Sequence, residues 1–106
     1  MAGRLRRDVI ARIWRGAVRS EDAEEYVAYV RDTGIEHYRS TSGNLGAWIL
    51  HRRRDELTEI LTFSLWEDME AVRAFAGDDP QRAVFYPEDD RFLVERGETV
   101  EHYDVD

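Results

Sequence analysis

The feature of this sequence that most constrains its fold is an alternating ten-residue segment, LTEILTFSLW, at residues 57–66. Successive side chains of a β-strand point to opposite faces of a sheet, so the two faces can be considered separately. One face carries four apolar side chains, those of Leu57, Leu61, Phe63 and Leu65. The other face carries Ile60 and Trp66, with hydroxyl side chains between them. Large apolar groups on both faces indicate a sheet that is covered on both sides.

The residues before this segment predict a strand and then a helix. DVIARIW, at residues 8–14, is β-branched and roughly alternating, which is typical of a strand. A helix is predicted over residues 20–34, because Ser20 can cap its N-terminus and acidic residues fill its first turn. Gly34 stands where the end of the helix is expected.

Two extended segments, residues 35–42 and 45–53, are predicted to follow this helix. Gly43, Asn44 and Gly46 interrupt them. Glycine takes positive φ freely and asparagine takes it at modest cost, so a β-bulge or a tight turn is expected at this point. A polar Arg-Asp-Glu turn then leads into the alternating strand.

After that strand, helical spacing returns at residues 66–77. Pro80 and Pro87 bound a predicted short helical turn at residues 80–86, and residues 98–106 predict a closing strand. The resulting order is β-α-β-β-α-β. This order predicts an α+β protein with the ferredoxin-like fold, an antiparallel sheet with two helices on one face.

Two helices can cover only one face of such a sheet. The extended segment at residues 45–53 also has two apolar faces, with Trp48 and Leu50 opposite Ala47, Ile49 and His51. A second copy of the chain is the simplest cover for the remaining face. We therefore expect a homodimer whose sheets face each other, which is a dimeric α+β barrel.

Length and composition limit the class of protein. A chain of 106 residues fits one domain, residues 1–106, without room for a separate catalytic lobe. The absence of cysteine excludes disulfides, thiolate metal sites and cysteine nucleophiles. A net charge of −8 disfavours nucleic acid as a partner. The sequence lacks a membrane-spanning apolar segment and a signal peptide, so a cytoplasmic protein without membrane contact is expected.

His51 and His102 are the candidate catalytic residues, because histidine has an ordinary pKa close to neutrality. Each ring could equally be half-buried and hydrogen bonded to backbone, and the sequence does not place the two together. The many aromatic residues could line a pocket for a flat ligand or fill the core. Three adjacent acidic residues at 88–90 are not spaced to converge, so no metal site is expected.

Nearly the whole chain resembles one known family. The matching segments are IARIWRG with AEEYVAYV, then GNLGAWILHR, ILTFSLWEDMEAVRAFAGDD, AVFYPEDDRFL and VEHYDV. In their order, and in the W-ED-EAVRAFAG segment, they resemble the antibiotic biosynthesis monooxygenase domain proteins. These are small dimeric α+β barrels of the ferredoxin-like fold. The motifs are specific for the superfamily rather than for one reaction.

The resemblance implies a pocket between helices and sheet in each subunit. Some relatives oxidise polycyclic aromatic phenols to quinones with molecular oxygen and without metal, flavin or nicotinamide, so no cofactor is expected. By this resemblance His51 or His102 would be the base. Asn44 or Arg12 would be a polar anchor for the substrate. The expected aromatic walls are Trp48, Trp66, Phe75 and Tyr86. The expected partners are an aromatic small molecule, molecular oxygen and a second copy of the chain.

A second branch of the superfamily degrades haem. It uses an asparagine on the first strand, a tryptophan on the second long helix and an axial histidine ten residues later. Here Phe75 and Phe85 stand at the last two positions, and the first strand has no asparagine, so haem degradation is not expected. Two alternatives to the oxygenase stay open: a non-oxidative isomerase, cyclase or lyase that uses the same histidines, and a small-molecule-binding dimer without turnover.

Overall fold

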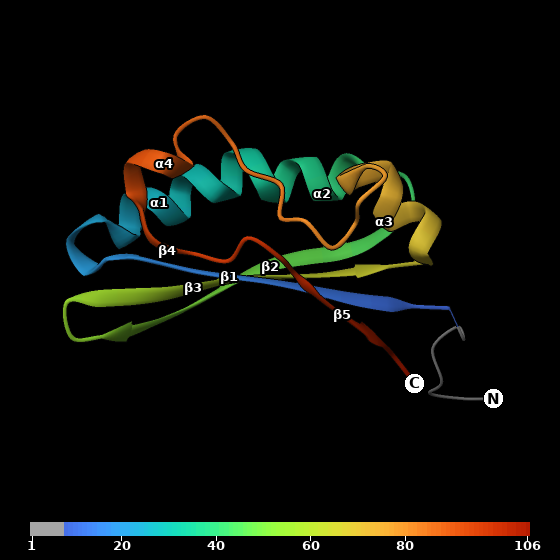
Figure 1. The fold of residues 1–106 in the computed structure, drawn as a ribbon, viewed down its shortest axis with the longest axis horizontal. Helices are drawn as coiled ribbons and strands as arrows, with labels where there is room; N and C mark the ends of the chain where they lie inside the picture. The colour runs from blue at the N-terminus through green and yellow to red at the C-terminus, as the bar shows by residue number, and fades with distance from the viewer. Residues whose placement is uncertain (1–7) are drawn as a thin grey trace.

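The computed structural model describes residues 8–106. Its strands are β1 (Ile10–Arg19), β2 (Asn44–Arg54), β3 (Leu57–Trp66), β4 (Leu93–Arg96) and β5 (Glu101–Asp104). Its helices are α1 (Ala23–Val30), α2 (Glu36–Ser40), α3 (Met69–Ala76) and α4 (Asp89–Phe92). A 3-10 turn, η1 (Ser20–Asp22), precedes α1, and a π-helical segment, η2 (Arg31–Ile35), joins α1 to α2. All four helices lie on one side of the sheet (Figure 1).

The sheet is antiparallel, with the strand order β2-β3-β1-β4 and with β5 also paired to β1. β1 pairs with β3 along its whole length, from Ile10 opposite Trp66 to Arg19 opposite Leu57. β5 and β4 share the other edge of β1, β5 along residues 10–13 and β4 along residues 16–18. This sheet with helices on one face confirms the predicted fold class. Within residues 8–106, no helix is long and apolar enough to cross a membrane.

The prediction of an extended segment at residues 35–42 is wrong. The helix continues through η2 into α2 and ends at Ser40, and Thr41 is the first extended residue. Burial explains the difference: Ile35 is 3% exposed and Tyr38 is 6% exposed, so both side chains belong to the core face of the helix. Gly34 is therefore an interior helix residue and does not end the helix.

The C-terminal third also differs from the prediction. The helical turn predicted at residues 80–86 is reduced to a single turn at Pro80 and Gln81, closed by Arg82 N–H donating to the oxygen of Asp79, because the backbone of residues 81–83 pairs with residues 98–100. Ala83 N–H donates to the oxygen of Glu98, and Val100 N–H donates to the oxygen of Gln81. The sequence also did not predict the short elements α4 and β4, and the closing strand is shorter than expected.

The predicted bulge is present at the start of β2. The register against β3 shifts between Asn44 and Gly46, where Gly46 has φ of +153°. The Asn44 Oδ1 accepts a hydrogen bond from Gly46 N–H at 3.0 Å. After the bulge, Trp48 lies opposite Phe63 and His51 lies opposite Ile60. Because those β3 residues alternate, Trp48 and His51 stand on opposite faces of the sheet, as predicted.

The face of the sheet away from the helices is apolar, and we call it the open face. Register places Trp48, Phe63 and Ile13 in one row across three strands, with Leu65 and Ala11 in the next. Three large side chains on it are about half exposed: Trp48, Leu50 and Tyr103. Glu59, which forms ion pairs with Arg15 and Arg52, lies one row beyond Leu61. The open face is thus an apolar patch bordered by charges.

Candidate active site

A small cavity lies between the sheet and the helix layer. Its volume is about 30 Å³, enough for about two water molecules. The side chains that matter most for its chemistry are Arg12, Tyr26, Tyr38, Phe85, Tyr86 and Asp89. They come from β1, from the continuous helix formed by α1, η2 and α2, from the segment between α3 and α4, and from the start of α4. The cavity therefore has aromatic walls, one cationic side chain and one carboxylate.

Arg12, on β1, supplies the cation, and only 2% of its surface is exposed. Its Nη2 donates to the backbone oxygens of Arg82 at 3.2 Å and Pro80 at 3.4 Å. Its guanidinium carbon lies 5.3 Å from the centroid of the Phe75 ring, within reach of a cation–π interaction. Its Nε has no hydrogen-bond partner. Burial lowers the pKa of Arg12, and the neighbouring Tyr38 hydroxyl opposes this effect.

Two tyrosine hydroxyls at the cavity are hydrogen bonded to other side chains. The Tyr38 hydroxyl lies 3.0 Å from Thr62 Oγ1, and the Tyr86 hydroxyl lies 2.7 Å from His37 Nδ1. Burial raises the pKa of both Tyr38 and Tyr86. Both hydroxyls are therefore protonated at neutral pH and can donate hydrogen bonds.

Asp89, the first residue of α4, is 4% exposed and supplies the carboxylate. Its Oδ1 accepts a hydrogen bond from the Tyr26 hydroxyl at 3.0 Å, and its Oδ2 accepts one from Tyr86 N–H at 2.6 Å. Burial raises the pKa of Asp89, and these two hydrogen bonds oppose the increase. Because both oxygens are occupied, Asp89 fastens the segment that carries Tyr86 to α1.

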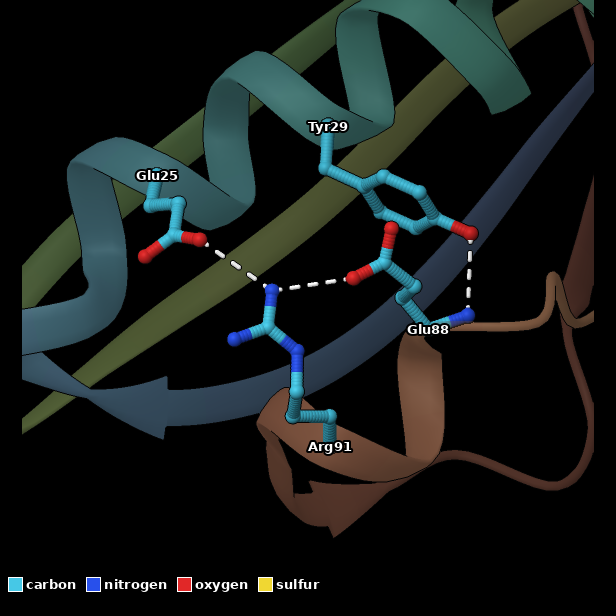
Figure 2. A network of polar contacts seen from close by, with 4 residues as sticks. All are labelled: Glu25, Tyr29, Glu88 and Arg91. Carbon is cyan, nitrogen blue, oxygen red and sulfur yellow. Dashed lines mark hydrogen bonds and ion pairs between the residues drawn. The ribbon is translucent and has the colours of Figure 1, made fainter.

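A surface cluster fastens the same segment from outside (Figure 2). Arg91 Nη2 donates to Glu25 Oε2 at 3.1 Å and to Glu88 Oε1 at 2.9 Å. Glu88 N–H donates to the Tyr29 hydroxyl at 3.0 Å. Glu25 and Tyr29 both belong to α1. Residues 84–86, which form a wall of the cavity, therefore lie immediately before an anchored stretch of chain.

His102, on β5, lies opposite Arg12 of β1 in the sheet. Its Nε2 is buried and has no hydrogen-bond partner. Burial lowers the pKa of His102, the Arg12 charge lowers it further, and Glu101 opposes both effects. The imidazole is therefore neutral at neutral pH and can accept a proton. His102 itself does not line the cavity, but Val100, two residues earlier, does.

The lowered pKa of His102 predicts how stability depends on pH. An unfolded histidine has a pKa near 6.5, so at slightly acidic pH the unfolded chain binds this proton more readily than the folded chain. The stability that the folded protein gains while His102 is neutral is fully present above pH 6.5 and is lost as the pH falls through the lower pKa of the folded state. Urea denaturation should show a smaller acid-induced loss of stability in His102→Gln than in the wild type. His51→Gln, at an exposed ring, is the control and should behave as the wild type; equal losses in all three proteins would contradict the assignment.

Four of the predicted site residues lie in or next to this region. Arg12 and Tyr86 line the cavity, and His102 is the strand neighbour of Arg12. Phe75 packs against the Arg12 guanidinium. Trp66 packs against Phe75 with ring centroids 5.6 Å apart, but it is fully buried in the core and does not line the cavity.

The other three predicted residues lie elsewhere. Asn44 holds the bulge, as its amide also donates to the oxygen of Leu65 at 3.2 Å. Trp48 lies on the open face and is 45% exposed. His51 is exposed and lies opposite Ile60, whereas Arg12 lies opposite Ser64. Four residues along a strand correspond to about 13 Å, so His51 is not part of the same site.

The sequence prediction missed five residues of the site: Tyr26, His37, Tyr38, Phe85 and Asp89. His37 and Tyr38 fell in the segment that was expected to be extended. The spacing of Val27, Val30 and Ile35 continues to Tyr38 and could have indicated one long helix. Asp89 was not distinguishable from its acidic neighbours. Within the part of the chain that the structure describes, no cluster of three or more histidine or acidic side chains could hold a metal ion.

The architecture can be compared with known proteins. No protein-family model matches the sequence, and no curated protein matches it. Solved structures do match: a conserved protein of Methanosarcina mazei has a TM-score of 0.69 at 16% identity, covering 94% of this chain and 95% of its own. A candidate antibiotic biosynthesis monooxygenase of Nitrosomonas europaea has a TM-score of 0.67 at 15% identity, covering 95% and 93%. This chain therefore shares its fold with these solved structures.

A third solved structure has the same fold. SnoaB of Streptomyces nogalater, a cofactor-independent oxygenase, matches with a TM-score of 0.57 at 20% identity and covers 91% of this chain and 89% of its own. These matches confirm the fold that the resemblance implied. At such identities the similarity concerns the fold, so the reaction has to be argued from the site.

Proposed function

We propose that this protein is a small-molecule enzyme that oxidises an aromatic, phenol-like substrate with molecular oxygen. The observation that carries the proposal is the cavity between sheet and helices, which has aromatic walls and a buried cation at Arg12. The fold shared with SnoaB supports the reaction class. In the proposed reaction the substrate reduces oxygen, without metal or organic cofactor, in the cytoplasm.

The proposed reaction converts a phenol into a quinone. A ring carbon loses its hydrogen and gains one atom of the oxygen molecule as a carbonyl oxygen. The second oxygen atom leaves as water with that hydrogen and the phenol proton. The deprotonated substrate supplies the electrons, so the protein has to provide a base, a polar anchor and walls that exclude water.

His102 is the proposed base and Arg12 the proposed anchor. His102 lies beside Arg12 in the sheet but does not line the cavity, so the opening that admits the substrate also has to reach its Nε2. His102 is neutral because its pKa is lowered, and its Nε2 has no other hydrogen-bond partner. The aromatic walls are Tyr38, Phe85 and Tyr86. A cavity of about 30 Å³ is smaller than an aromatic ring requires. Binding therefore has to move the wall formed by residues 84–86 outward. This wall is held at both ends, by the backbone pairing of residues 82–83 on one side and by the Asp89 hydrogen bonds on the other.

We also propose that a second copy of the chain covers the open face. Its exposed residues Trp48, Leu50 and Tyr103 form an apolar patch beside the charged cluster around Glu59. An apolar centre with a polar rim is the usual organisation of a protein interface. A two-fold dimer would bury this patch in both copies and leave the helix side, with the cavity, facing outward.

The direct test is oxygen consumption with a panel of polycyclic phenols, with and without a metal chelator. We expect substrate-dependent oxygen uptake that survives the chelator. His102→Ala is expected to lower turnover about 100-fold, in the usual range for loss of a general base. His51→Ala is the matched control, because that ring is exposed and lies at the far end of β2.

The same assay separates the alternatives. Product formed under anaerobic conditions would replace the oxygenase by an isomerase, cyclase or lyase. Binding without turnover would support a ligand-binding dimer. Full turnover in His102→Ala would remove His102 as the base while leaving the oxygenase reaction in place.

A further inference from the structure

The buried charge of Arg12 has no counter-ion within the described chain. No carboxylate of residues 8–106 forms an ion pair with its guanidinium, although the residue is almost fully buried, with only 2% of its surface exposed. Its Nε also has no hydrogen-bond partner, and only Nη2 donates to backbone oxygens. A buried cation without an anion is costly, because the charge loses its hydration and gains little in return.

The neighbouring groups do not supply that anion. Asp89 also lines the cavity, but it forms no ion pair with Arg12, and its two oxygens point to other donors, the Tyr26 hydroxyl and Tyr86 N–H. Burial also raises the pKa of Asp89, which favours its neutral form. His102 is neutral or cationic in every protonation state. The tyrosine hydroxyls nearby are neutral at physiological pH. An anion that balances Arg12 therefore has to enter from outside.

We propose that the natural ligand of this cavity is an aromatic carboxylate whose carboxylate group binds Arg12. The Nε–H of Arg12 is free to donate, and a planar guanidinium matches the two oxygens of a carboxylate, whereas a phenolate offers a single oxygen. The aromatic walls at Tyr38, Phe85 and Tyr86 then accept the ring. This proposal rests on the site of the proposed function and narrows its substrates to phenols that carry a carboxylate.

The test uses benzoate and benzamide, which have the same shape but differ in charge. Benzoate is expected to bind the wild-type protein at least tenfold more tightly than benzamide, measured by calorimetry. The ¹H–¹⁵N resonance of the buried Arg12 Nε–H gives a direct second readout. It should move to higher proton frequency with benzoate, because that donor gains an acceptor.

Two variants localise the effect. Arg12→Gln removes the charge but retains donors for the carbonyls of Pro80 and Arg82, and it should bind benzoate no better than benzamide. Arg15→Gln removes a charge three residues away on the same strand, on the opposite face, and should bind like the wild type. Because the Nε–H measurement is made on the wild type, it decides the question even if Arg12→Gln folds poorly.

Several results would overturn the assignment. Equal binding of benzoate and benzamide, or no binding of either, would show that Arg12 is not a carboxylate receptor. Tighter binding of 4-nitrophenolate than of benzoate would show that a phenolate is the anion recognised. These outcomes are independent of oxygen consumption. Benzoate recognition without turnover would support the carboxylate site and reject the oxygenase. Turnover without benzoate recognition would support the oxygenase and reject the carboxylate site.

Discussion

The Phe63→Asp variant is expected to be a monomer, whereas the wild type is expected to be a dimer. Phe63 lies between Trp48 and Ile13 in the middle row of the open face, with ring centroids of Phe63 and Trp48 5.8 Å apart. A two-fold interface would bring two new carboxylates into its apolar centre. Burying unpaired charges costs several kcal/mol, so the dimer dissociation constant should rise at least about 1000-fold, since each tenfold change corresponds to about 1.4 kcal/mol.

Analytical ultracentrifugation over a range of concentrations measures this change. The variant should sediment with the mass of one chain, 12.5 kDa, and the wild type with twice that mass. Ala74→Asp adds the same charge on the exposed side of α3 and should remain dimeric. A monomeric wild type would reject the dimer, and a dimeric Phe63→Asp would move the interface away from the open face.

The sheet could be predicted from the sequence because alternation is a local signal. The ten alternating residues of β3 predicted its two faces, whereas its register with β1 and β2 came only from the structure. The long helix was predicted only in part. A glycine such as Gly34 usually marks the end of a helix. Here the burial of Ile35 and Tyr38 outweighs that preference. The apolar spacing indicates that Ile35 and Tyr38 could share a helix face, but only the packing against the sheet decides between that spacing and the preference of glycine.

The candidate site was harder to predict for a similar reason. Arg12 appeared only as one polar group on a first strand, and nothing local shows that it would be buried without a carboxylate. Asp89 and Tyr26 are 63 residues apart and meet only through the fold. His51 and His102 were equivalent in the sequence, and the strand pairing with Arg12 separates them.

The Asp89→Ala variant is expected to lose about 2–6 kcal/mol of unfolding free energy. The substitution leaves two donors at the cavity, the Tyr26 hydroxyl and Tyr86 N–H, without their acceptor. Each unsatisfied buried donor costs about 1–3 kcal/mol. The measurement is urea denaturation at a fixed protein concentration, because a dimer would make the stability depend on concentration. Asp90→Ala removes the same charge at the next, exposed position and should leave the stability almost unchanged.

Asp89→Asn separates the role of the charge from the role of the hydrogen bonds. Burial raises the pKa of Asp89 above its ordinary 3.8, so the folded protein favours the neutral carboxyl. The associated stabilisation is complete below pH 3.8 and is lost as the pH rises through the raised pKa. At neutral pH the neutral amide should therefore cost less than alanine, because it keeps an acceptor without a buried charge. An asparagine variant as unstable as the alanine variant would show that the charge itself holds the wall of the cavity in place.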